Sequence, residues 1–155
     1  MKKTILAASS LVLAGVAPAS AQSIQVTEAG SNRSIIAPAQ NFSGTAAVTP
    51  LFPGNAETHA TGGLVNFTPG ARTAWHTHPA GQMLIITSGR GWVQEEGRER
   101  IVVRAGDVVW IPVGVKHWHG ATASDAMAHI ALSYMKDGNN VTWMEQVTDE
   151  QYAAP

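Results

Sequence analysis

The apolar residues of this chain come in short runs that glycines and prolines separate. Residues 56–67 alternate between polar and apolar, which predicts a strand with one face buried, and four further runs have the composition of buried strands: 82–87, 100–104, 108–111 and 127–134. Residues 92–94 and 100–104 flank a charged stretch and predict a hairpin. Seven or eight short strands with little helical periodicity predict an all-β fold, either a barrel or a double-sheet jelly roll.

Glycines mark the expected turns at 88–91, 105–107 and 137–140. Near the end of the chain, Thr148 is followed by two acidic residues, the pattern of a helix N-cap and first turn, so we expect a short C-terminal helix. Barrels of this kind close over an interior that holds one small ligand, and the inward-facing polar residues would line it.

The first 21 residues have the three features of a secretory signal peptide. Lys2 and Lys3 are basic, residues 5–16 form an apolar run, and residues 19–21 are a small-residue cleavage site. The apolar run is short for a membrane span, so we expect an exported protein, periplasmic or secreted, without a membrane span once the signal peptide is removed. Residues 22–44 are interpreted as a loosely held N-terminal arm that contributes one edge strand, and 45–155 as a single domain.

The composition narrows the classes of function. The chain has no cysteine, so disulfides and thiolate metal ligands are excluded. Its net charge is −1 and the basic residues are scattered, so we expect no nucleic-acid partner. We expect the protein to act on or bind a small molecule.

Four histidines form two pairs, each with one residue between its members. His76 and His78 make one pair, and His117 and His119 the other. Residues i and i+2 of a strand point to the same face, so each pair directs two imidazoles at one place. Gln82 begins a buried strand and adds an amide oxygen. Imidazoles and amide oxygens bind divalent cations, so the pattern indicates a metal site.

The spacing of these residues resembles the two sequence motifs of the cupin family. The matching residues are Gly70-x5-His76-x-His78-x3-Gln82-x6-Gly89 and Gly106-x5-Pro112-x-Gly114-x2-His117. This resemblance implies a cupin-type jelly-roll barrel with one divalent metal held by His76, His78, Gln82 and His117. The chain has Gln82 where the family more often has glutamate, and Ala121 where asparagine is common.

Four stretches resemble a narrower group, the small bacterial cupins that include manganese-dependent hydroxynitrile lyases acting on (R)-mandelonitrile: 67–79, 106–110, 116–121 and 143–152. This resemblance implies a carbon–carbon lyase that cleaves or forms (R)-cyanohydrins, and it favours Mn(II). Ser133 stands where those lyases have glutamine. The alternatives are a metal-dependent dioxygenase of the cupin class and a non-catalytic periplasmic cupin that binds a small ligand.

The ligand set also suits Fe(II), Co(II), Ni(II) or Zn(II). Three neutral imidazoles and a neutral amide leave the charge of a dication uncompensated, which favours binding of small anions such as cyanide. His119 is interpreted either as a proton-transfer residue or as an interior histidine, and His129 either as its catalytic partner or as part of the core. His59 is expected at the rim.

Two tryptophans, Trp75 and Trp118, each stand next to a histidine and must point to the opposite face of their strands. We expect them in packing between sheets or between subunits, where large aromatic side chains contribute most. The sequence therefore predicts a homo-oligomer, a dimer or a tetramer.

Overall fold

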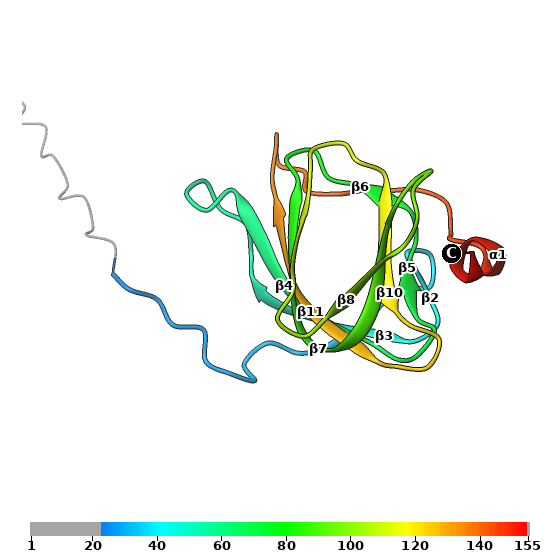
Figure 1. Ribbon diagram of the computed structural model, residues 1–155. Coiled ribbons are helices and arrows are strands. Elements are labelled where there is room, and N and C mark those ends of the chain that lie inside the picture. Colours follow the sequence, from blue (N-terminus) through cyan, green and yellow to red (C-terminus); the bar gives the residue numbers. More distant parts are fainter. Residues whose placement is uncertain (1–22, 155) are drawn as a thin grey trace, which may run out of the picture.

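The computed structural model describes residues 23–154, which form a barrel of strands with one short helix at the end (Figure 1). The predicted signal peptide lies outside the described residues. Five of the twelve strands are only two residues long, and the seven longer ones match the predicted number. In chain order the elements are β1 (Ile35–Ile36), β2 (Phe42–Ser43), β3 (Ala46–Phe52), β4 (Ala60–Phe67), β5 (Arg72–Thr73), β6 (His76–Thr77), β7 (Gln82–Glu95), β8 (Ile101–Arg104), β9 (Val108–Ile111), β10 (His117–Ala121), β11 (Met127–Tyr134), β12 (Thr142–Trp143) and α1 (Asp149–Ala153).

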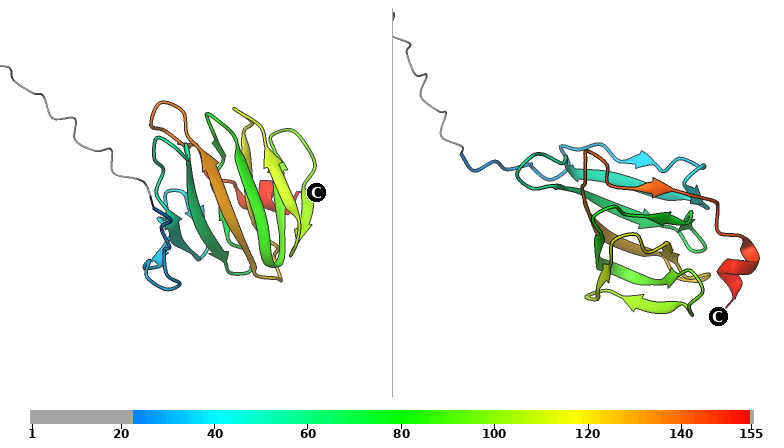
Figure 2. Two further views of the ribbon diagram at one scale, coloured as in Figure 1. Left: turned by 90° about the vertical axis from the view of Figure 1, so that its left-hand side faces the viewer. Right: turned by 90° about the horizontal axis from the view of Figure 1, so that it is seen from above.

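Two antiparallel sheets face one another across the interior, and the long strand β7 belongs to both (Figures 1 and 2). Its first half pairs with β11 and β9, in the sheet that continues through β4 and β3 to β1. Its second half pairs with β10 and β8, in the sheet that continues from β10 through β5 to β2. The all-β jelly-roll prediction is confirmed.

The prediction of a turn at 88–91 is wrong, because these residues lie inside β7. Gly89 has a φ of +71°, and a β-carbon there would meet the carbonyl oxygen of Ala126 on the way into β11. The β7–β11 register also shifts between Ala128 and His129, as at a β-bulge. Glycine here lets one strand pass from the first sheet to the second without ending.

Most of the other predicted elements are confirmed, but the strand predicted over 56–67 begins at Ala60 because residues 56–58 form a turn. β7 and β8 form the hairpin with the charged tip, and the turns at 105–107 and 137–140 are present. Thr148 caps α1, since its hydroxyl accepts the amide proton of Gln151 while the Gln151 side chain accepts that of Thr148. The arm contributes two short strands, one more than expected, and Phe42 of β2 is buried in the core.

The apolar core fills the rest of the barrel interior and borders the histidines, with Leu84, Ile86, Phe67 and Met127 among its buried side chains. No helix in the described range 23–154 is long and apolar enough to cross a membrane.

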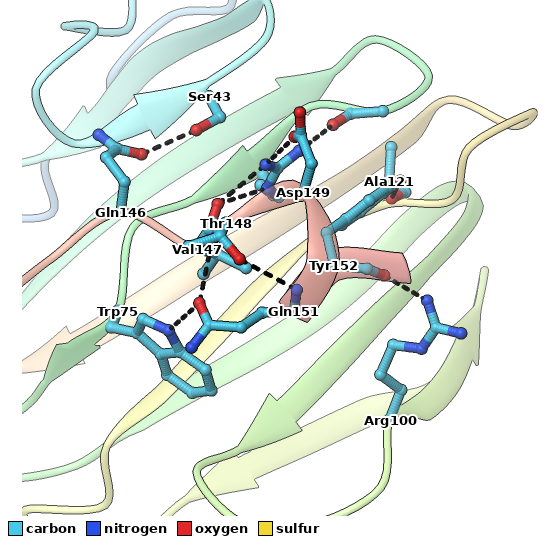
Figure 3. Close-up of polar contacts among 12 residues, drawn as sticks. Ser43, Trp75, Arg100, Ala121, Gln146, Val147, Thr148, Asp149, Gln151 and Tyr152 are labelled. Carbon is cyan, nitrogen blue, oxygen red and sulfur yellow. Dashed lines mark hydrogen bonds and ion pairs between the residues drawn. The ribbon is translucent and has the colours of Figure 1, made fainter. Parts of the chain in front are cut away.

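A second, smaller cluster lies outside the barrel, where the C-terminal segment crosses the second sheet. Trp75 and Trp118 do face away from the interior, as predicted, but Val147 and Tyr152 of the same chain cover them. Figure 3 shows Gln151 reaching Trp75, and Tyr152 lying between Ala121 and Arg100. The tryptophans thus pack between a sheet and the C-terminal segment of the same chain, so their burial gives no argument for a second subunit.

Candidate metal centre

The two histidine pairs meet because β6 and β10 are neighbouring antiparallel strands. His76 on β6 lies directly opposite His117 on β10, and their ring centroids are 4.1 Å apart. His119 follows on the same face of β10, 5.2 Å from His76 by ring centroids. His78 lies one residue beyond β6, 5.1 Å from His76. All four rings are buried, so the imidazoles predicted to face one point do converge.

The rings of His76, His78 and His117 share one orientation, set by the backbone. Nδ1 of each ring bonds to a carbonyl oxygen, those of Ala74 at 2.9 Å, Val115 at 3.0 Å and Asn140. A carbonyl only accepts, so a neutral ring that makes this bond carries its proton on Nδ1 and has a lone pair on Nε2 that is directed inward. This is the arrangement in which histidines bind metals, with the second nitrogen held by a hydrogen bond.

His119 is held differently, by another histidine. Its Nδ1 lies 3.1 Å from Nε2 of His129 on β11, the strand across the interior. One of these nitrogens must donate and the other accept. When His129 donates, Nε2 of His119 carries a proton; when His119 donates, the same atom offers a lone pair. Phe67 packs against both rings, with centroid distances of 6.0 Å to His119 and 5.5 Å to His129.

Gln82 stands at the start of β7 with its amide oriented by its neighbours. Its Nε2 donates to the hydroxyl of Ser133 at 3.1 Å, and its Oε1 lies 3.3 Å from Nε2 of His117. The amide oxygen therefore faces the histidine cluster. The register explains the contact, because Ser133 on β11 is the direct partner of Gln82 on β7.

Burial keeps the interior histidines neutral. Loss of water lowers the pKa of His117 and of His129 to about 4 in each case. Burial and the neighbouring imidazoles lower the pKa of His76 and of His119 well below the ordinary value, and burial also lowers that of His78. Near neutral pH these five rings carry no charge and can offer lone pairs.

The histidines open onto a cavity of about 330 Å³, within the range of small-molecule sites. Apolar side chains form its walls, among them Phe42, Val48, Val65, Ala131 and Trp143. The described residues that line it include no Asp, Glu, Lys or Arg. A cation bound here would keep its full charge, as expected from the neutral ligand set.

Among residues 23–154 only three buried side-chain nitrogen or oxygen atoms lack a hydrogen-bond partner, and all three belong to these histidines: Nε2 of His78, Nε2 of His119 and Nδ1 of His129. A buried polar atom without a partner costs folding free energy, and a ligand bound among these histidines would offset that cost. Nitrogens of His76, His117 and His119 lie within 4.8 Å of one another and could hold a divalent metal ion. The donor set fits such an ion.

Five of the six predicted site residues line this cavity, and the sixth, His117, lies against His76 and Gln82. The compact triad of nitrogens consists of His76, His117 and His119, and His78 lies outside it although its ring is as near to His76 as the ring of His119 is. His129 is not simply core, since its ring bonds to His119. His59 lies in a separate exposed hollow beside Asp137, at the rim as expected.

Two contributors to the site were missed from the sequence. Trp143 packs on His76 with 4.7 Å between ring centroids, and Asn140 orients His78 through its carbonyl. Both follow the last long strand. After β11 the chain returns, and β12 pairs with β6. No local sequence pattern predicts a pairing between segments so far apart in the chain.

Fold and site together define a small jelly-roll barrel with an interior histidine cluster that could hold a divalent metal. The chain belongs to the cupin family. Residues 63–133 match the family's cupin domain. The chain is 50% identical over 129 residues to an (R)-mandelonitrile lyase of Granulicella tundricola, an alignment that covers 83% of this chain and 98% of that protein.

Two other relatives are more distant or partial. A cupin-like protein from Thermotoga maritima has a crystal structure that superposes with a TM-score of 0.72 at 38% identity, covering 83% of this chain and 95% of that one. An acireductone dioxygenase of Trichormus variabilis is 31% identical over 81 residues, which is 50% of this chain and 42% of that protein.

Proposed function

We propose that the protein is a metal-dependent hydroxynitrile lyase that cleaves or forms (R)-cyanohydrins such as mandelonitrile. The observation that carries the proposal is the 50% identity to an (R)-mandelonitrile lyase along nearly all of that protein's length. The chemistry of the cavity supports it, because an apolar chamber with one cluster of neutral metal donors suits an uncharged aromatic substrate that releases a small anion.

His76, His78, Gln82 and His117 are the proposed ligands of one divalent metal, with Mn(II) favoured over Fe(II), Zn(II), Ni(II) and Co(II). The three histidines of this set are distinguished from His119 by their Nδ1 contacts with backbone carbonyls, which fix Nε2 as a donor. The bound ion would supply positive charge that stabilises an oxygen anion or cyanide.

The proposed task of His119 and His129 is to hold and move the proton. In the cleavage direction, Nε2 of His119 accepts the proton of the substrate hydroxyl while its Nδ1 proton bonds to Nε2 of His129. The bond between the hydroxyl carbon and the nitrile carbon then breaks, the carbonyl forms, and the electron pair leaves with cyanide. Returning the proton to cyanide gives hydrogen cyanide and restores the neutral pair. Both rings are neutral near pH 7, as this acceptor role requires.

The walls provide a place for the substrate's aromatic ring. Phe42 and Trp143 stand 5.7 Å apart by ring centroids, and Val48 lies on the facing sheet beside the same cavity. Aromatic side chains favour offset or edge contacts with a substrate ring.

The test is an assay of the metal-loaded protein with racemic mandelonitrile and, in the reverse direction, with benzaldehyde and cyanide. We expect turnover that favours the (R)-enantiomer, disappears after metal removal, and drops strongly in the His119→Ala and His129→Ala variants. Metal-loaded protein without turnover in either direction would contradict the proposal and leave a binding cupin as the better description.

A metal-dependent dioxygenase is the second candidate, favoured by the partial similarity to an acireductone dioxygenase. Oxygen uptake separates the two, because cyanohydrin cleavage is redox-neutral and proceeds at the same rate without oxygen. Turnover that stops under anaerobic conditions would favour the dioxygenase.

We also propose that the protein is exported and self-associates. Export is supported by residues 1–21. Self-association is supported by exposed apolar side chains on the edge strand β9 and just after it, Val108, Trp110 and Val113. Fractionation of cells and light scattering of the purified protein test these two proposals separately.

A further inference from the structure

Gln82 differs from the other proposed ligands because its side chain has two chemically opposite ends. The oxygen of an amide binds cations, whereas the NH2 group only donates protons and would repel a metal ion. The two ends have nearly the same shape, so packing alone does not distinguish them. Something must hold the amide with its oxygen toward the histidines.

The hydroxyl of Ser133 is placed to do this. It accepts a hydrogen bond from Nε2 of Gln82, with 3.1 Å between the two atoms. Oε1 of Gln82 is thereby left facing Nε2 of His117 at 3.3 Å. Both side chains are buried, with exposed fractions of 4% for Gln82 and 8% for Ser133, so water competes little for the contact. The two residues are direct partners across β7 and β11, so the backbone fixes their separation.

We propose that Ser133 is a positioning residue that fixes Gln82 as an oxygen donor to the metal. Without the hydroxyl, the NH2 group of Gln82 has no partner on β11, and the flipped amide becomes competitive. In that orientation the amide opposes the ion. The inference rests on the metal site of the proposed function and is independent of the reaction.

A carboxylate provides the decisive comparison, because its two oxygens are equivalent and need no orientation. If Ser133 acts by orienting the amide, its hydroxyl should matter when residue 82 is glutamine and matter little in the Gln82→Glu background. If Ser133 acts only by filling space, its removal should have the same effect in both backgrounds. Such a cycle isolates the coupling between the two side chains.

The experiment measures Mn(II) affinity of the full chain by competition with a fluorescent chelator, for the parent protein, Ser133→Ala, Ser133→Thr, Gln82→Glu and the Ser133→Ala/Gln82→Glu double variant. We expect Ser133→Ala to weaken Mn(II) binding about tenfold, the scale of one lost hydrogen bond to a ligand. Ser133→Thr keeps a hydroxyl and should restore most of the affinity. In the Gln82→Glu background the loss should be about threefold or less.

Melting temperatures in the presence of a chelator show that each variant is folded. Equal losses in the two backgrounds, or no loss in Ser133→Ala while the parent binds Mn(II) tightly, would overturn the positioning role alone. A parent protein that binds no Mn(II), Fe(II), Co(II), Ni(II) or Zn(II) would overturn the metal site and this inference with it.

Discussion

The two faces of the sheet formed by β6 and β10 differ in how completely their polar groups are satisfied. On the outer face, Nε1 of Trp118 donates to Gln94 at 2.7 Å and Nε1 of Trp75 donates to Gln151 at 3.3 Å. On the inner face, the histidine cluster leaves buried nitrogens without partners. The outer face of these strands thus has its tryptophan N–H groups hydrogen-bonded within the chain, whereas the inner face has nitrogens free to bind a ligand.

This difference indicates that the outer face stabilises the fold, whereas the inner face serves ligand binding. The outer cluster is aromatic, covered by the C-terminal segment and tied to it by hydrogen bonds, as expected of a region that stabilises the fold. Neutral imidazoles packed on the inner face lose hydration and gain too few contacts in return, so that face costs stability unless a ligand binds. Changes on the inner face should therefore alter metal binding, and changes on the outer face should alter unfolding.

The largest expected effect is on the inner face. We expect His76→Ala to lower metal affinity by at least about a hundredfold, since even residues that only orient a ligand are worth about 10–100-fold. The metal-dependent rise in melting temperature should vanish with it, because an ion bound only by the folded state stabilises that state. Metal analysis and thermal unfolding with and without a chelator measure both. Full metal content in this variant would remove the ligand assignment.

The matching change on the outer face is Trp118→Ala. Trp118 is fully buried, so truncation should cost about 3–5 kcal/mol of unfolding free energy in the metal-free protein. Urea denaturation measures the loss. The metal content of the chains that remain folded should stay at the parent value, and a selective loss of metal at unchanged stability would break the comparison.

Acid should destabilise the metal-free protein through its inner face. The pKa of His117 and that of His129 are about 4 in the folded protein, whereas unfolded histidine has a value near 6.5. The unfolded chain therefore binds protons first as pH falls, so stability drops between about pH 6.5 and 4. Between pH 7 and pH 6 each of these residues should cost about 0.5–1 kcal/mol. Denaturation at a series of pH values tests this, and a stability that is flat or rises on acidification from pH 7 to 5.5 would contradict it.

The smallest expected effect comes from Tyr152→Phe, again on the outer face. The hydroxyl donates to the carbonyl oxygen of Ala121 at 2.8 Å, and its loss should cost about 0.5–1.5 kcal/mol. Metal affinity should not change. A fall in metal affinity without a fall in stability would show that the outer cluster controls the site.

Much of this division was predictable from the sequence, because a strand's period of two is a local rule. The rule alone puts His117 and His119 on one face of their strand and Trp118 on the other. It likewise predicts that His76 and Trp75 face apart. The inward direction of Gln82 was expected from its spacing after His78, which resembles that of the cupin motif.

What covers each face was not predictable in this way. The C-terminal segment meets Trp75 through residues far along the chain, such as Gln151, which is 76 residues away and accepts a hydrogen bond from Trp75. The carbonyl of Asn140 that orients His78 belongs to a loop whose position depends on the whole barrel. The passage of β7 between sheets was missed because glycines at 89 and 91 mark a bulge as readily as a turn.

Elemental analysis of the protein purified without added metal tests most directly whether the histidines of the inner face hold a metal ion. We predict one divalent ion per folded chain, Mn(II) in preference to the others, and none in the His76→Ala variant. A correctly folded parent protein that contains no metal, and takes up none when each of the candidate ions is supplied, would contradict the account.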